Sequence, residues 1–165
     1  MDAVDKILAQ WAAERPDLDT TAMGPIGRFS RVAHGFSRRM GETFAKYELN
    51  ASSFDVLATL RRSPPPHALS AGELMGSMMI TSGTMTNRID QLVKAGLVSR
   101  SPDPEDARRA VVKLTAEGFK LIDAVMADHV QTQGAILSDL NQDEVAQLDA
   151  LLRKLMTSME GKSAD

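Results

Sequence analysis

Apolar side chains recur every third or fourth residue in the first part of this 165-residue chain, which is the spacing of one helical face. The first such stripe consists of Val4, Ile7, Leu8 and Trp11. Pro16 predicts that this helix ends near Arg15, because a proline disfavours the helical conformation of the residue before it. A longer amphipathic helix is predicted over residues 26–47, and a third over 51–61, where Asn50 supplies the N-cap.

Shorter elements follow a run of three prolines. Ser70 and Glu73 have the spacing of a capping box, in which each side chain accepts the other residue's backbone N–H, and they predict a short helix over 71–78. The next helix is predicted to begin at residue 81 or 82 and to end at residue 95. Gly96 stands where a helix C-cap favours glycine.

Two strand-like runs come next, at residues 97–100 and 110–114, and they predict a β-hairpin. The residues between them, 101–109, are polar and rich in turn formers, so the hairpin has a long charged loop. Thr115 is expected to cap a helix that runs to about residue 137. A second capping box at residues 141–144 begins a final helix with an apolar stripe.

A helix, a tight turn, a second helix and a hairpin, in this order, predict a winged helix-turn-helix. In that arrangement the second helix enters the major groove of duplex DNA and the hairpin reaches the adjacent backbone. We therefore expect a mainly α fold with a small β-hairpin wing (α+β). The expected organisation is an N-terminal extra helix (1–20), a dimerisation helix (21–50), the winged lobe (51–114) and C-terminal dimerisation helices (115–160).

Composition removes several classes of function. The chain has no cysteine, which excludes a disulfide scaffold, a cysteine nucleophile and a Cys-ligated zinc site. His34, His67 and His129 fall in separate elements without metal-ligand spacing, so we expect neither a metal nor a cofactor. No phosphate-binding loop or nucleophile elbow occurs, and no enzyme is expected. Without an apolar run of membrane-spanning length or a signal peptide, the protein is expected to be cytoplasmic, with no membrane partner.

The net charge of −3 conceals an uneven distribution. Residues 61–115 carry 8 Lys and Arg against 5 Asp and Glu, whereas the rest of the chain carries 11 against 17. A basic middle fits a segment that meets a polyanion such as DNA. The residues expected to contact DNA are Ser82, Thr84, Thr86, Asn87 and Arg88 on the second helix, and Arg108, Arg109 and Lys113 on the wing.

The second helix and the wing each allow an alternative role. The polar face of the second helix is also what an ordinary solvated helix presents, and Arg108 can instead pair with Asp103 or Asp106 to stiffen the loop. A function of another class is a winged-helix module that docks a protein partner and has no small-molecule effector. Binding to duplex DNA with a steep salt dependence distinguishes a DNA-binding protein from such a module.

The terminal helices carry more apolar surface than one DNA-binding module can cover, which predicts a homodimer. The expected dimer seam consists of Leu121, Ile122, Val125, Leu148, Leu151, Leu152 and Leu155. For any single one of these residues, burial in the core of its own chain is the alternative.

The region around the wing carries a recognisable motif. It consists of Gly96-Leu97-Val98, then Asp103, Asp106 and Arg108, then Val112-Lys113-Leu114-Thr115 and Gly118. This motif resembles the pattern of the MarR (multiple antibiotic resistance regulator) family, and the resemblance extends over about residues 23–159. It implies a winged-helix repressor that binds a pseudo-palindromic operator as a dimer, with the long helix and the two C-terminal helices interleaved between subunits.

The extra N-terminal helix resembles that of the urate-responsive PecS-like and HucR-like subgroup. By this resemblance, four residues take part in ligand sensing: Trp11, Asp55, Arg88 and Arg100. The chemistry is consistent, because a flat aromatic anion suits an indole face and a guanidinium, while Asp55 is expected to pair with an arginine until the ligand competes. Urate or a related purine, a phenolic or other aromatic carboxylate, and no small effector at all remain three alternatives.

Overall fold

The structure is a computed structural model that describes residues 1–78, 85–103 and 109–161. In chain order, the elements of this part are α1 (Ala3–Glu14), α2 (Met23–Ala45), α3 (Ala51–Arg62), β1 (Ala68–Ser70), α4 (Ala71–Ser77), α5 (Met85–Lys94), β2 (Val98–Pro102), β3 (Ala110–Leu114), α6 (Ala116–Ile136) and α7 (Gln142–Gly161). The fold is mainly helical with a small antiparallel sheet, which confirms the expected class. None of the helices in the described ranges is long and apolar enough to cross a membrane.

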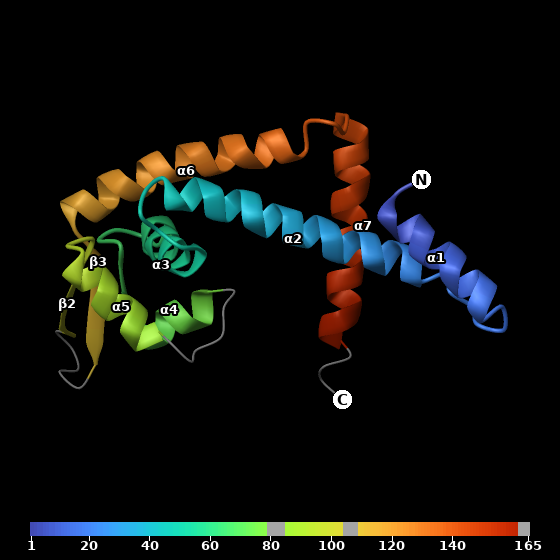
Figure 1. The fold of residues 1–165 in the computed structure, drawn as a ribbon. Helices are drawn as coiled ribbons and strands as arrows, with labels where there is room; N and C mark the ends of the chain where they lie inside the picture. Colours follow the sequence, from blue (N-terminus) through green and yellow to red (C-terminus); the bar gives the residue numbers. More distant parts are fainter. Residues whose placement is uncertain (79–84, 104–108, 162–165) are drawn as a thin grey trace.

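The elements are arranged along the long helix α2 (Figure 1). A lobe of α3, α4, α5 and the strands lies at the C-terminal end of α2, and α1 packs against its N-terminal end. Helix α6 leaves the lobe and lies beside α2. With 23 residues, α2 is about 34 Å long, so it separates α1 from the lobe by most of the length of the molecule.

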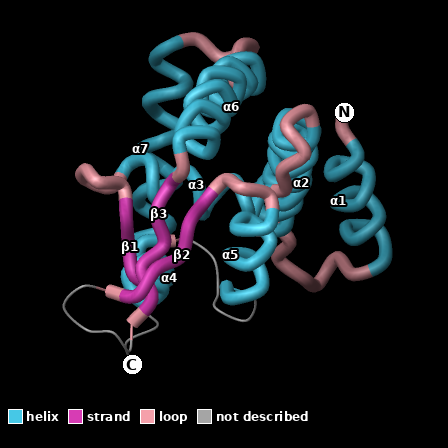
Figure 2. The backbone as a smooth tube through the Cα atoms, turned by 90° about the vertical axis from the view of Figure 1, so that its left-hand side faces the viewer, coloured by secondary structure: helices cyan, strands magenta, loops and turns pink. Residues whose placement is uncertain are grey.

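The wing is a three-stranded sheet rather than the predicted hairpin alone (Figure 2). Strand β3 lies between β1 and β2 and is antiparallel to both, so that Val112 pairs with Leu69 on one side and Arg100 on the other. Sequence reasoning missed β1, because three residues directly after a proline run are too few to show strand alternation. At the loop end, the Asp103 N–H donates to the Arg109 carbonyl over 2.9 Å.

Local capping explains where several helices begin and where α5 ends. Asn50 accepts from the Ser53 amide at 2.9 Å, and the predicted boxes form at Ser70 and at Asn141. Gly96 has a φ of +72°, the left-handed conformation that favours glycine at a helix end. The start predicted for the second helix at residue 81 or 82 lies outside the described residues, where α5 begins at Met85.

The hydrophobic core fills the lobe and takes in the first half of α6. Its fully buried members are Val56, Leu57, Leu60, Leu74, Val98, Val112, Ile122 and Val125. The assignment of Ile122 and Val125 to the dimer seam was therefore wrong. Both side chains are 0% exposed within a single chain, because this part of α6 packs against α3 and β3.

Candidate functional site

Helix α5 presents a polar face opposite an apolar one. Met85, Ile89 and Leu92 are buried in the lobe, as the sequence predicted. Thr86 and Asn87 are exposed on the other side, and so are available to a groove. Ser82 and Thr84, the other two uncharged candidates for DNA contact, lie outside the described residues.

The basic residues of the wing occupy different places along it. Arg109 is exposed at the loop end of β3, and its charge contributes to holding the pKa of Glu73 below its usual range, after the larger effect of hydrogen bonds with Ser70. Lys113 is exposed four residues further along, about 13 Å away on an extended strand, beside the start of α6. Arg108 lies outside the described residues.

Asp55 lies in the middle of α3, at the floor of a cavity between α3 and α6. Its Oδ2 is buried and has no hydrogen-bond partner in the described part of the chain. Burial raises the pKa of the Asp55 carboxyl, and the positive charges of Arg62 and Arg88 oppose that rise. The expected direct ion pair between Asp55 and an arginine is therefore absent among the described residues, and both arginines act from a longer distance.

The cavity has a volume of about 430 Å³, within the range of small-molecule sites. Its lining consists of Phe54, Asp55, Ala58, Arg61, Arg62, Asp123, Met126 and His129.

One wall of this cavity is aromatic and another is charged. The Phe54 ring stacks on Phe44 with centroids 4.2 Å apart and lies 4.8 Å from the ring of His129. The Nδ1 atom of His129 is buried without a hydrogen-bond partner in the described ranges, and burial lowers the pKa of this imidazole. Arg61 donates from Nε to Asp123 over 2.7 Å. A flat molecule with polar edges matches this combination of ring faces, guanidinium groups and unsatisfied polar atoms.

Of the four residues implied in ligand sensing, a single chain brings Asp55 and Arg88 near each other but not Trp11 or Arg100. Arg88 is half-buried on α5, and its positive charge acts on the Asp55 carboxyl. Arg100 instead pairs with Asp90 at 3.4 Å, and Trp11 lies on α1, at the opposite end of α2 from the lobe.

Sequence reasoning also missed residues of this cavity. Arg62 follows Asp55 by seven residues and so shares its helical face, a signal that was present in the sequence. No signal pointed to His129, because α6 approaches α3 only in the tertiary structure. Within the described ranges, no group of three or more His, Asp or Glu side chains could hold a metal ion.

Apolar faces of α2 and α7 are left uncovered in the described part of the chain. Helix α7 has no buried residue along its 20 positions. The exposed side chains are Leu151, Leu155, Met156 and Met159 on α7, and Ile26, Phe29, Val32 and Phe36 on α2. Two helices with uncovered apolar faces need a partner surface, since a monomer seldom exposes so large a patch.

Known proteins resemble this chain in sequence and in fold. The MarR family profile matches residues 49–110. The HTH-type transcriptional regulator PecS of Dickeya dadantii is 42% identical over 152 residues, which cover 92% of each chain. A structure of a mutant MarR from Escherichia coli complexed with operator DNA has a TM-score of 0.70 and 29% identity, covering 82% of this chain and 96% of that one.

A third relative is BpsR of Bordetella bronchiseptica, whose DNA binding is regulated by 6-hydroxynicotinic acid. It matches with a TM-score of 0.70 and 26% identity over 79% of this chain and 91% of that one. The relatives are transcriptional regulators, not enzymes. With 42% identity to PecS over nine-tenths of both chains, this chain belongs to the MarR family of winged-helix transcriptional regulators.

Proposed function

We propose that the protein is a repressor that binds a pseudo-palindromic duplex operator as a homodimer and leaves it when a small aromatic anion such as urate binds. The observation that carries the proposal is the position of Arg88. This residue belongs to α5, the helix offered to DNA, and its charge acts on Asp55 in the cavity between α3 and α6. A ligand that changes the state of Asp55 therefore also acts on the DNA-contacting helix.

The DNA side of the proposal is supported by the polar face of α5 and by the basic wing. Thr86 and Asn87 supply donors and acceptors for base edges, and Arg88 supplies a guanidinium. Arg109 and Lys113 supply positive charge for the phosphate backbone, and Ser82, Thr84 and Arg108 belong to the same proposed surface by sequence position. Because its target is chromosomal DNA, the proposal keeps the expected cytoplasmic location.

The dimer is supported by the uncovered faces of α2 and α7. A two-fold dimer would bury these faces and place the two lobes at opposite sides of the seam, which suits two half-sites on one face of a duplex. Leu148, Leu151, Leu152 and Leu155 remain in the proposed seam, whereas Ile122 and Val125 do not, and Leu121 is half-buried against the core of the lobe.

The ligand side is supported by the chemistry around Asp55. Urate carries ring N–H groups that can donate hydrogen bonds to a buried carboxylate oxygen, and its negative charge suits Arg62 or Arg88. A phenolic carboxylate has no ring N–H to offer to Asp55. Trp11 and Arg100 complete the proposed set if the second subunit or a movement of the wing brings them to the cavity. BpsR, regulated by a nitrogen heterocycle, gives a precedent for the class of effector.

A gel-shift titration of the purified protein on its own upstream intergenic DNA tests the proposal, with urate added and with salicylate and xanthine as comparisons. Specific binding that urate releases supports the repressor, its ligand class and the Asp55 site. Specific binding that is indifferent to all three compounds contradicts the effector and leaves the regulator. Absence of specific binding contradicts the regulator and favours the protein-docking module.

Two variants test the assigned residues. Replacing Arg108 and Arg109 by alanine is expected to weaken binding to all DNA sequences alike and to flatten the salt dependence by about four units of slope, because each subunit of the dimer loses two charges. An unchanged slope would refute the wing contacts. Trp11→Ala is expected to leave operator affinity nearly intact and to weaken the response to urate. Loss of dimerisation in this variant would instead show that Trp11 is a core anchor.

A further inference from the structure

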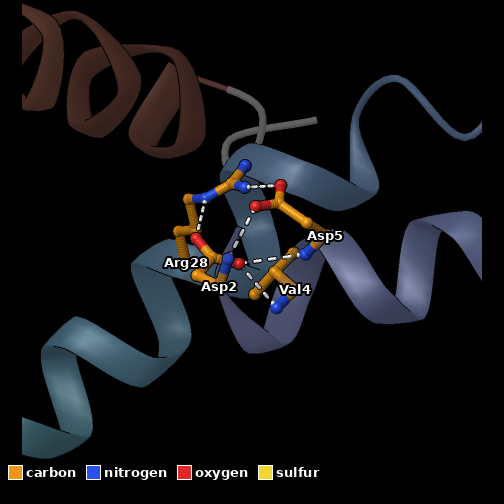
Figure 3. Close-up of polar contacts among 4 residues, drawn as sticks. All are labelled: Asp2, Val4, Asp5 and Arg28. Carbon is orange, nitrogen blue, oxygen red and sulfur yellow. Dashed lines mark hydrogen bonds and ion pairs between the residues drawn. The ribbon is translucent and has the colours of Figure 1, made fainter.

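Helix α1 is held to α2 by a single arginine that bridges both carboxylates at the start of α1 (Figure 3). Arg28, in the second turn of α2, donates from Nε to Asp2 Oδ2 over 2.7 Å and from Nη2 to Asp5 Oδ1. The same two carboxylates form the capping box of α1 with their other oxygens. Asp2 Oδ1 accepts from the amides of Val4 and Asp5, and Asp5 Oδ2 accepts from the Asp2 amide. All four carboxylate oxygens are thus engaged by one guanidinium and one helix start.

The apolar contact beneath this arrangement comes from Val4 and Leu8, and half-buried Leu8 lies near Gly24, where an added Cβ would come within 3.4 Å of Leu8 Cδ1. Val4 is the only fully buried residue of α1, and it lies close to Gly27, where an added Cβ would come within 3.3 Å of Val4 Cγ1. Farther along α1 the same stripe opens to solvent, since Ile7 is 39% and Trp11 is 41% exposed. The bridge adds a directional restraint to these apolar contacts, and as a solvent-exposed ion pair it makes the smaller contribution.

The bridge and Trp11 are at opposite ends of one rigid helix. Nine residues separate Asp2 from Trp11, about 13 Å along the axis. Beyond Trp11, the chain turns through a link in which Arg15 pairs with Asp17 at 2.7 Å, and then enters α2. Helix α1 is therefore tethered to α2 at its C-terminal end by the chain and at its N-terminal end by Arg28, and the two tethers together set its direction.

We propose that Arg28 is a positioning residue for ligand sensing: by holding the start of α1 on α2, it sets where Trp11 stands in the dimer. The inference rests on the proposed function for the role of Trp11. Without the bridge, α1 stays joined through its link but samples other directions, and the indole must be ordered when ligand binds. That ordering lowers ligand affinity and leaves DNA contacts, which lie at the far end of α2, unaffected.

The test uses the full-length protein and three variants. Arg28→Gln removes both ion pairs, whereas Arg28→Lys keeps the charge without the two-pronged geometry. Arg38→Gln is the matched control, because it breaks the Arg38–Glu42 pair of 2.7 Å within the same helix and involves no residue of α1. Trp11 is the sole tryptophan of the chain, so its fluorescence reports on α1 alone.

We expect Arg28→Gln to raise acrylamide quenching of Trp11. It should also raise the urate concentration for half-maximal DNA release by about two- to fivefold, which is the size of effect expected for the loss of exposed ion pairs. Operator affinity without urate is expected to stay within about twofold of the parent. Arg28→Lys should restore part of both effects, and Arg38→Gln should show neither. A Trp11 signal and a urate midpoint equal to those of Arg38→Gln would overturn the proposal.

Failure of the proposed function gives a different result. If the parent protein does not respond to urate but Arg28→Gln still changes Trp11 quenching, the effector assignment fails and the role of Arg28 in sensing is overturned with it, leaving only an attachment of α1. If the parent responds and Trp11 quenching is unchanged in Arg28→Gln, the proposed function stands and the positioning role is refuted.

Discussion

Gly118, in the first turn of α6, is predicted to be intolerant of any side chain. A Cβ at this position would lie 2.9 Å from the carbonyl carbon of Leu97 and still closer to its carbonyl oxygen. The oxygen is only 1.9 Å from that Cβ, and ordinary carbon–oxygen contacts begin at about 3.3 Å, so the two backbone segments would have to separate by more than an ångström. That movement would strain the bonds of 3.1 Å that the Thr115 amide and hydroxyl donate to the Leu97 carbonyl.

The expected cost of Gly118→Ala follows from two opposing effects. Overpacking a tight contact costs about 1–3 kcal/mol, and here the neighbour is backbone, which places the cost at the upper end. Alanine in a helix recovers about 0.5–1 kcal/mol relative to glycine. The net loss in free energy of unfolding is therefore about 2 kcal/mol, or roughly 4–8 °C in Tm for a chain of this size.

Urea and thermal unfolding at fixed protein concentration measure this loss, since the stability of a dimer depends on concentration. Gly134→Ala is the matched control on the same helix, because an added Cβ there meets nothing within 4 Å. This control is expected to gain about 0.5–1 kcal/mol. If Gly118→Ala proved as stable as Gly134→Ala, the close approach of α6 to Leu97 would be wrong.

Three further predictions concern charge and assembly. Because burial raises the pKa of Asp55, the contribution of the protonated carboxyl to stability is present below the ordinary pKa of 3.8 and is lost as pH rises. In urea unfolding, Asp55→Asn is therefore expected to be more stable than the parent at pH 7, and the difference should vanish in acid. Arg28 and the helix amides lower the pKa of Asp2 to about 2, so the contribution of the Asp2 carboxylate to attaching α1 is present above pH 3.8 and disappears as pH falls towards 2. Over that pH interval, Trp11 quenching should rise in the parent and stay flat in Arg28→Gln. Leu155 is 58% exposed in one chain, and Leu155→Glu is expected to raise the dimer dissociation constant more than about tenfold without unfolding the lobe, because both subunits of a two-fold dimer lose the contact. Analytical ultracentrifugation measures this constant, and an unchanged value would remove α7 from the seam.

Two particular regions show how far sequence reasoning reaches into this fold. The caps at Asn50 and Thr115 were predicted to the residue, since a capping side chain and the amide that it receives are only three positions apart. The stripe of Met85, Ile89 and Leu92 was predicted to be buried, and it is. In each case the evidence lies within one turn or one face of a single helix.

The candidate site shows the limit of the same reasoning. Asp55 was identified through a family resemblance, but its buried oxygen without a hydrogen-bond partner in the described residues and its neighbour His129 became visible only when α3 and α6 came together. Arg100 was expected beside the ligand, and in this chain it pairs with Asp90. Charge type was readable from the sequence, whereas the partner of each charge was not.

By itself, the sequence determined the order of the helices and of the two hairpin strands, several helix caps, the apolar face of each helix and the MarR-family motif around the wing. The tertiary structure decided that β1 joins the wing, that Ile122 and Val125 belong to the core of the lobe while α7 is left uncovered, and that Arg28 attaches α1 to α2. The physical reason is that periodicity reports which face of an element avoids water, and does so within a few residues. What covers that face depends on contacts between segments far apart in the chain, which no local pattern records.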